Sequence, residues 1–302
     1  RLLRDSKIIK SGTTRQAQYF LKTEKNKEIR ILLEPGIEEH KIWQENFLAD
    51  FETLPKNILE ICEYGFLEML NNAIDHSEGT GVVINTKWEP NSIRITIYDN
   101  GIGIFKKIKN TLNLTDERES ALHLSKGKFT TDPDNHTGEG IFFTSRAFDN
   151  FHITSREMAY IRDNQDEDWF LETAEGSKAK GTILRMTIGL NSKRKMQEVY
   201  AQYQNEGADG IQKFDKTYIG VMLSKLGDER YVSRSQARRI VLGLEKFKHV
   251  LLDFKDISTV GQGFVDEVFR VFQSKYPRIK IEYTNANDDV RFMIERSLPE
   301  GQ

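Results

Sequence analysis

The sequence predicts a mixed α/β chain with two folded domains, and three observations support this class. A stretch that begins at Pro55 repeats apolar residues every three or four positions, which is the period of a helix. The segment after it alternates apolar and polar residues, which is the period of a strand. Beyond residue 213, strand-like and helix-like segments alternate, as in a small α/β unit. A length of 302 residues also suits two domains.

Composition excludes several broad classes. The net charge of −2 gives no overall attraction to polyanions or membranes. No apolar run approaches the roughly 20 residues that span a bilayer, and no signal peptide is visible, so we expect a cytoplasmic chain. The single cysteine, Cys62, lies on the apolar stripe of the expected helix and predicts a buried thiol. The chain begins at Arg1 instead of methionine, so we expect further residues upstream.

Residues 1–30 have a local excess of lysine and arginine, and they include the N-terminal segment, residues 1–22. It predicts two short strands joined by a Ser-Gly-Thr-Thr turn, and this hairpin resembles the wing of a winged helix-turn-helix domain. The resemblance implies that Lys10 and Arg15 contact a DNA backbone without reading bases. An ordinary basic hairpin explains the pattern equally well, because the helices that would read bases are absent. Residues 23–55 are expected to form a connector with an amphipathic segment.

The helix expected after Pro55 carries a polar face with Glu68 and Asn72 one turn apart. A carboxylate and an amide oxygen at this spacing can serve an attacking water and a hydrated magnesium ion, because Mg²⁺ prefers oxygen ligands and retains several waters. Taken alone, such a pair is more often a solvated helix face.

The strand expected next has the sequence SIRITIYDNG, in which isoleucines alternate with polar residues. Asp99 has the same parity as the isoleucines, so its carboxylate should point toward the apolar side, where it needs hydrogen-bond partners. The amino group of adenine would be a suitable partner. Gly101 and Gly103 then allow a tight turn and a close approach of backbone to a ligand, although DNGIG alone is usually only a turn.

Residues 105–137 predict a long polar loop, which inside a compact domain is typical of a functional lid. Lys126 and Lys128 lie in it, where closure could bring one of them to a terminal phosphate, and solvated loop charges are the alternative. Gly138 and Gly140 follow and precede an apolar run that predicts a helix. The N–H groups at the start of such a helix form a natural phosphate site.

Strand-like segments separated by turns fill residues 151–190. Thr182 opens the last of them, within KGT, where its hydroxyl could complete the contact between Asp99 and adenine through a water. A Gly-Thr pair has no meaning by itself, so the order of all these signals carries the inference.

In that order, EMLNNAIDH, DNGIG, TGEG and KGT resemble the N-box, the two glycine boxes and the closing motif of the GHKL superfamily of ATPases. The resemblance covers residues 56–190 and implies a Bergerat-type two-layer α/β sandwich that binds ATP and Mg²⁺. It implies that Glu68 is the general base, Asn72 the magnesium ligand and Asp99 the adenine reader. The backbone around the phosphates and lid would come from Gly101, Gly103, Gly138 and Gly140.

Residues 191–213 predict a charged helical linker, and residues 214–302 predict the small α/β domain. The run LDFKDISTVGQGFVDEVFRVF resembles the STAS domains of anti-anti-sigma factors, specifically the STAS-like type found behind such ATPases. The resemblance implies a regulatory module that packs against or binds a protein partner.

The sequence departs from the two family patterns at two places. Glu139 and Phe142 replace the small or aliphatic residues that are usual around the second glycine box, so the form of the lid is open. Gly261 and Gln262 occupy the neighbourhood where a phosphorylatable serine follows the central strand of STAS regulators. The second departure favours packing or partner binding over control by phosphorylation.

We interpret the chain as an ATP-binding and ATP-hydrolysing regulatory switch that couples nucleotide state to a DNA or protein partner. The first alternative is a protein serine kinase of the anti-sigma type, which would use Glu68 on a substrate hydroxyl. The second alternative is a DNA-binding or scaffold protein stabilised by nucleotide. A histidine kinase is disfavoured, because His40 is the one candidate phosphoacceptor upstream of the N-box and lies in no convincing acceptor helix. Pairing into a homodimer through the ATP domain rests on fold analogy alone.

Overall fold

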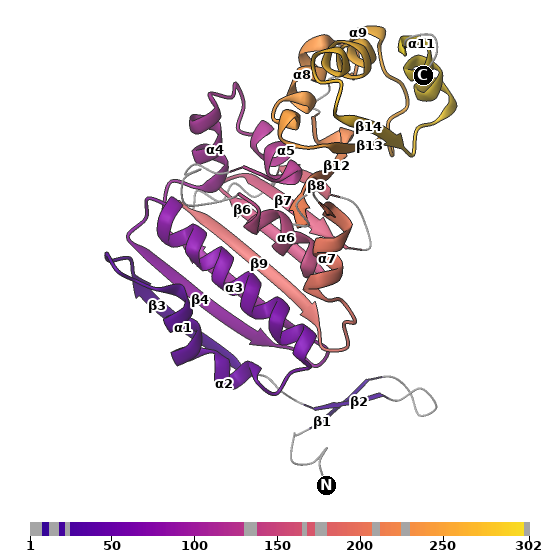
Figure 1. Cartoon of the computed structure of the whole chain (residues 1–302). Helices are drawn as coiled ribbons and strands as arrows, with labels where there is room; N and C mark the ends of the chain where they lie inside the picture. Colours follow the sequence, from indigo (N-terminus) through magenta and orange to yellow (C-terminus); the bar gives the residue numbers. More distant parts are fainter. Residues whose placement is uncertain are drawn as a thin grey trace.

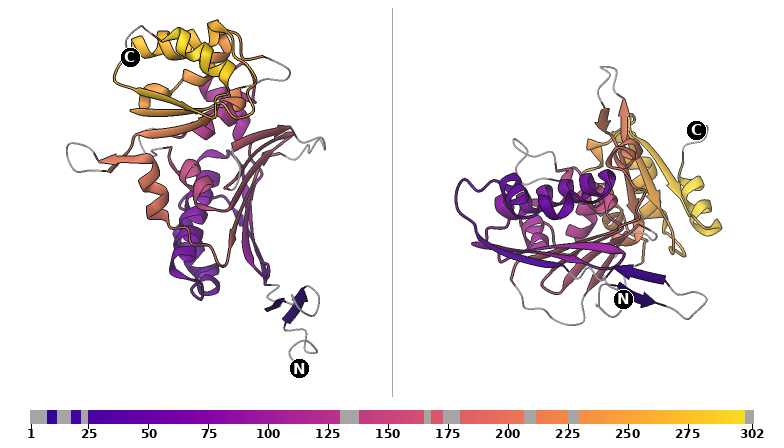
Figure 2. Two further views of the ribbon diagram at one scale, coloured as in Figure 1. Left: turned by 90° about the vertical axis from the view of Figure 1, so that its right-hand side faces the viewer. Right: turned by 90° about the horizontal axis from the view of Figure 1, so that it is seen from below.

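The computed structural model describes residues 8–11, 18–21, 25–129, 138–164, 168–172, 180–206, 212–224 and 230–298. A large sheet covered by helices and a smaller C-terminal domain lie side by side, and a short N-terminal hairpin lies at the far end from the C-terminal domain (Figures 1 and 2). The mixed α/β fold class predicted from sequence is confirmed.

The large sheet has seven strands in the order β3-β4-β5-β9-β6-β7-β8, and each pair of neighbours is antiparallel. The last of these strands along the chain, β9, is therefore the middle strand, between β5 and β6. Buried and half-buried residues alternate along all of β5, and Asp99 shares the buried face with the isoleucines, as its parity predicts. The strands are β3 (Asn26–Leu32), β4 (Gly81–Trp88), β5 (Ser92–Asp99), β6 (Asn150–Ser155), β7 (Met158–Asp163), β8 (Asp168–Glu172) and β9 (Thr182–Gly189).

Helix α3 (Lys56–His76) crosses one face of this sheet and buries the predicted apolar stripe, with Cys62 fully covered (Figure 1). Burial raises the pKa of that thiol well above its usual range. Pro55 precedes the first turn as its N-cap residue. Two further helices lie on the same face, α6 (Gly140–Ala147) and α7 (Met196–Tyr203).

The stretch expected to be a connector, residues 23–55, contains the edge strand β3 and the helices α1 (Glu39–Asn46) and α2 (Leu48–Phe51). Strand β3 pairs with β4 over its whole length. The ring of Trp43 on α1 is buried against Phe66 of α3, with centroids 4.9 Å apart. This stretch is thus packed into the sheet and its helical layer.

The stretch expected to be a polar loop contains two helices in its described part, α4 (Ile104–Leu112) and α5 (Glu119–Lys126). Helix α4 does repeat Ile104, Ile108 and Leu112 at helical spacing, within a stretch whose overall composition is polar, whereas the apolar residues of α5 follow no helical period. All residues of α5 are buried, because its far side contacts the C-terminal domain. That cover could not be read from the local sequence.

The C-terminal domain is built on a parallel sheet of β12 (Lys216–Gly220), β13 (His249–Asp253) and β14 (Lys280–Thr284). A short hairpin, β10 (Gln204–Glu206) with β11 (Gln212–Phe214), leads into it from α7. Its helical elements lie together over the sheet in Figure 1. They are η1 (Val221–Ser224), α8 (Arg234–Val241), η2 (Leu244–Lys246), α9 (Gln262–Val265), the π-helical turn η3 (Asp266–Phe272), α10 (Gln273–Lys275) and α11 (Asp288–Ser297).

The N-terminal hairpin consists of β1 (Ile8–Ser11) and β2 (Gln18–Leu21), which pair in antiparallel fashion. Arg15, the expected backbone-contacting residue of the turn, lies outside the described residues, and the side chain of Lys10 is also not described. Within the described ranges no helix combines the length and apolar character that crossing a membrane requires.

Candidate functional site

A cavity of about 480 Å³ opens between α3, the ends of β5 and β9, α4 and the start of α6. Its volume lies within the roughly 300–1,000 Å³ of small-molecule sites. Apolar side chains such as Ile97, Ile108 and Leu184 contribute to its wall. Seven of the residues expected from sequence line it together: Glu68, Asn72, Asp99, Gly103, Gly138, Gly140 and Thr182.

Asp99 is the carboxylate expected to read adenine, and it is 6 % exposed at the end of β5. Its Oδ1 accepts hydrogen bonds from the backbone N–H of Gly101 (2.9 Å) and of Thr182 (3.3 Å). Burial raises the pKa of Asp99, while these bonds act in the opposite direction. Gly101 therefore supports the carboxylate and does not itself line the cavity.

Thr182 reaches Asp99 because β9 pairs with β5 and places the two residues opposite each other. Its hydroxyl donates a hydrogen bond to the carboxylate of Asp99 and accepts one from the backbone N–H of Ile104 at 3.1 Å. The same side chain thus connects Asp99 to the first turn of α4.

Gly103 is held tightly between β5 and α4. Its φ of +90° favours glycine, and a Cβ there would overlap the hydroxyl of Ser155, which donates to the carbonyl of Gly181 at 2.8 Å. A side chain at this position would therefore disturb the strand ends that carry Asp99 and Thr182.

Glu68 and Asn72 face the cavity from one side of α3. The Asn72 Nδ2 donates to the carbonyl of Glu68 at 2.8 Å, so the amide oxygen is the end of this side chain that can meet a cation. Gly140 begins α6 directly beside Glu68, because a Cβ at Gly140 would overlap Glu68 Oε2. The carboxylate therefore lies at the N-terminal end of α6, where the helix dipole favours negative charge.

The donor set suits magnesium better than a metal held by several side chains. Across the described residues, no group of three or more His, Cys, Asp or Glu is placed to hold a metal ion. Magnesium needs no such group, since one side-chain oxygen with phosphates and waters can complete its shell.

The two lysines of the expected lid lie elsewhere. The ammonium groups of Lys126 and Lys128 contact backbone carbonyls of the C-terminal domain, and neither residue lines the cavity. This differs from the expectation that one of them reaches a terminal phosphate. The physical reason is that the C-terminal carbonyls of α8, far along the chain, offer Lys126 acceptors that local sequence does not reveal.

Other polar residues of the wall had no role assigned from sequence. Lys107, in the first turns of α4, lines the cavity and pairs with Glu78, so the cavity contains a cation where the loop lysines were expected to provide one. His76 at the end of α3 lines it as well. Lys107 follows DNGIG by one helical turn, and that spacing is the signal that could have identified it.

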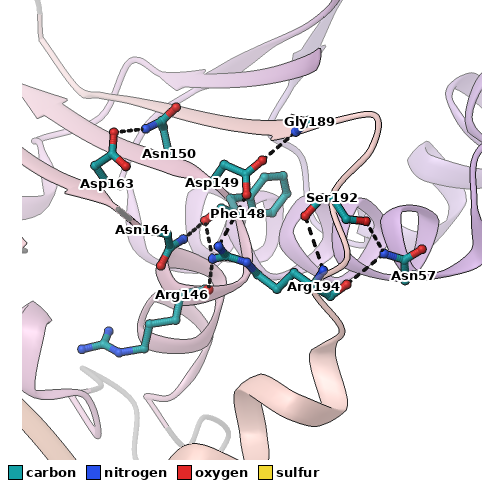
Figure 3. A network of polar contacts seen from close by, with 10 residues as sticks. All are labelled: Asn57, Arg146, Phe148, Asp149, Asn150, Asp163, Asn164, Gly189, Ser192 and Arg194. Atoms are coloured by element: carbon teal, nitrogen blue, oxygen red, sulfur yellow. Dashed lines mark hydrogen bonds and ion pairs between the residues drawn. The ribbon is translucent and has the colours of Figure 1, made fainter. Parts of the chain in front are cut away.

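Helix α6 is held in place by a polar network around its C-terminal end (Figure 3). The Arg194 guanidinium donates to the carbonyls of Arg146 (2.9 Å) and Phe148 (3.3 Å) and pairs with Asp149 at 3.5 Å. The Asn57 amide donates to two carbonyls of the following linker, at 2.9 Å each. Through Arg194, the network connects the C-terminal end of α6 to the start of α3.

A sheet covered by helices, with a buried aspartate and glycines around one cavity, is the arrangement of a domain with a small-molecule site. Residues 63–189 match the family model described as histidine kinase-, DNA gyrase B- and HSP90-like ATPase. Residues 236–291 match a STAS-like domain of unknown function. The chain therefore carries a GHKL-type ATPase domain followed by a STAS-like domain, and the resemblance read from its motifs is confirmed. No curated protein matches the chain.

Together these two domains support ATP binding and a regulatory role.

Proposed function

We propose that this chain is a magnesium- and ATP-dependent switch, in which nucleotide turnover at the cavity controls the binding of a protein or DNA partner. Asp99 reads the adenine, Asn72 is the protein ligand of Mg²⁺, and Glu68 is the general base. The N-terminal hairpin and the STAS-like domain are the parts through which nucleotide state would reach a partner.

The observation that carries the proposal is the environment of Asp99. A carboxylate offers about four acceptor sites, so after the bonds from Gly101 and Thr182 it can still accept an amino group from the cavity side. Burial of this carboxylate, which is 6 % exposed, makes each of its hydrogen bonds valuable, and a donor from a bound base would add to those from Gly101 and Thr182. This environment supports selection of adenine over bases without an amino group at that position.

The remaining residues support chemistry at the opposite end of the nucleotide. Bound Mg²⁺ would neutralise phosphate charge, and the amide oxygen of Asn72 would be its protein ligand, since the Nδ2 of this side chain is engaged with the Glu68 carbonyl. Glu68, beside the start of α6, would orient a water or a substrate hydroxyl and accept its proton. The N–H groups around Gly138 and Gly140 can bind phosphate oxygens.

Calorimetric titration of the full chain with Mg·ATP tests the nucleotide site. We expect Asp99→Asn to weaken binding by roughly 10- to 100-fold, because a hydrogen bond to a charged group contributes about 1.5–3 kcal/mol. The exposed carboxylate of Asp75 on α3 provides the control, and Asp75→Asn should bind as wild type does. Equal affinity of Asp99→Asn and wild type would contradict the assignment of Asp99.

Incubation with γ-labelled ATP tests the chemistry and separates the two enzyme classes. Free phosphate as the product supports the ATPase, and label on a protein hydroxyl supports the kinase. In either case Glu68→Gln should lower the rate by roughly 10²- to 10⁴-fold, while the exposed Glu60→Gln on the same helix should not. Tight binding with no turnover, unchanged by Glu68→Gln, would instead support a structural nucleotide.

A further inference from the structure

Residues 124–129, the bridging segment, connect α5 to the wall of the nucleotide cavity. Leu124, Gly127 and Phe129 line the cavity. Lys126 and Lys128, which alternate with them, point to the C-terminal domain instead. One short piece of backbone therefore has the candidate nucleotide site on one side and the STAS-like domain on the other, and in Figure 1 α5 lies beside β12.

The side chain of Lys126 is buried against the C-terminal domain. It is 2 % exposed, and its ammonium group donates to the carbonyls of Arg239 (2.7 Å) and Leu242 (2.9 Å) at the end of α8. The negative end of the helix dipole stabilises a cation at that position. The ammonium group also donates to carbonyls that lack partners within the helix. The hydroxyl of Thr217 on β12 donates to the Lys126 carbonyl at 2.7 Å, so its backbone is held as well.

The cost of burying this lysine makes the contact specific. Burial lowers the pKa of Lys126 to about 7, because the ammonium group gives up its water. Only well-placed acceptors compensate such a group, and the two carbonyls of α8 supply them. If the C-terminal domain moved away, Lys126 would return to water and the bridging segment would lose its fixed position.

Lys128 forms a second anchor. Its ammonium group donates to the carbonyl of Lys246 at 2.9 Å and lies over the ring of Phe247, 4.8 Å from the centroid. Lys246 donates back to the carbonyl of Lys128 at 3.2 Å. The φ of Lys128 is +55°, which residues other than glycine rarely adopt, so these contacts hold a backbone shape that the segment would not favour alone.

The other side of the segment shapes the cavity. The backbone of Phe129 lies directly against Gly138, where a Cβ would come within 2.7 Å of the Phe129 nitrogen. Gly127 fits between the rings of Phe142 and Phe214, where a Cβ would meet ring carbons at 2.7 and 2.8 Å. Phe142, unusual beside the second glycine box, therefore packs where the C-terminal part of the chain docks.

We infer that the STAS-like domain of this chain is itself a partner coupled to the nucleotide site: its docking on residues 126 and 128 and nucleotide binding at the cavity strengthen each other through the bridging segment. The inference rests on the proposed function and specifies its regulation. Docking fixes the cavity wall in advance, so nucleotide binding does not have to order it. By linkage, bound nucleotide must then stabilise docking by the same factor.

Lys126→Met in the full chain tests the coupling, because it keeps the length of the side chain and removes the ammonium group. With a non-hydrolysable ATP analogue and Mg²⁺, we expect calorimetry to give a Kd about tenfold weaker than wild type. Without nucleotide, amides around residues 239–246 should exchange hydrogen faster than in wild type, and nucleotide should slow their exchange in wild type. Lys275→Met, an exposed lysine on α10, is the matched control and should change neither readout.

Thr217→Val provides a second variant, because it removes one hydrogen bond to the Lys126 backbone and should shift both readouts in the same direction by less. Circular dichroism checks that each variant is folded. Faster exchange with a Kd within about twofold of wild type would overturn the coupling, and tighter nucleotide binding would overturn its sign. If wild type binds no nucleotide, the proposed function itself is overturned. This failure appears in the wild-type measurement, whereas a failure of the coupling appears only in the variants.

Discussion

Gly140→Ala should separate the activity of this protein from its stability. A Cβ at this first residue of α6 would overlap Glu68 Oε2 and lie 3.1 Å from Glu68 Cδ, so the carboxylate must rotate away. Alanine is favoured over glycine by about 1 kcal/mol inside a helix, which is an upper limit for this first position. An off-rotamer Glu68 side chain costs about 0.5–1.5 kcal/mol. The two nearly cancel, so the free energy of unfolding should change by less than about 1 kcal/mol.

Turnover should respond very differently, because a general base must lie within hydrogen-bond reach of the proton that it accepts. Displacing Glu68 should lower the rate of phosphate release from Mg·ATP by roughly 10²-fold, toward the lower end of what a positioned base contributes. The ATP Kd should change little, because the new methyl group points at Glu68. Phosphate release, calorimetry and thermal denaturation measure the three quantities.

A double-mutant cycle shows whether the loss passes through Glu68. If it does, Gly140→Ala combined with Glu68→Gln is no slower than Glu68→Gln alone, because both changes remove the same contribution. Wild-type turnover in Gly140→Ala, or rate losses that multiply in the double variant, would refute the placement of Gly140 against the base.

Three further outcomes are expected. Burial raises the pKa of Asp99 in the folded protein, so wild type is most stable below the unfolded-state pKa and loses stability as pH rises through the folded-state pKa. Asparagine carries no charge, so the Tm of Asp99→Asn relative to wild type should be higher at pH 7 than at pH 4. A relative gain independent of pH would contradict that sign. Arg194→Ala removes bonds to two carbonyls at the end of α6 and should destabilise by about 1–3 kcal/mol in urea, while Lys193→Ala, at an exposed neighbour, should not. Thr182→Val leaves the Ile104 N–H without its acceptor and should cost about 1 kcal/mol and weaken ATP binding, and unchanged affinity would argue against this tie.

The features that sequence predicted well are those with a strong local period. The side of the sheet to which Asp99 points follows from parity along one strand, and α3 follows from a repeat sustained over 21 residues. Each of the motifs was ambiguous by itself, and the family resemblance indicated that together they form one ATP site.

The features that sequence missed depend on partners far along the chain. Lys126 looked like lid charge because its acceptors are the carbonyls of Arg239 and Leu242, 113 and 116 residues away. Strand β3 looked like part of a connector because only its pairing with β4 makes it a sheet edge. Helix α5 lacked a clear period because its cover comes from another domain. Such contacts leave no periodic trace in a single sequence.

The middle position of β9 has a consequence for the order in which the protein forms during synthesis. Thr182 and Asp99 are 83 residues apart, yet they share the hydrogen bonds of the nucleotide site. A nascent chain that ends before β9 has β5 and β6 with no strand between them, so both would expose unpaired backbone edges. If Asp99 and Thr182 hold the nucleotide as proposed, ribosome-bound chains of increasing length should acquire ATP binding only after residue 189 has left the ribosome.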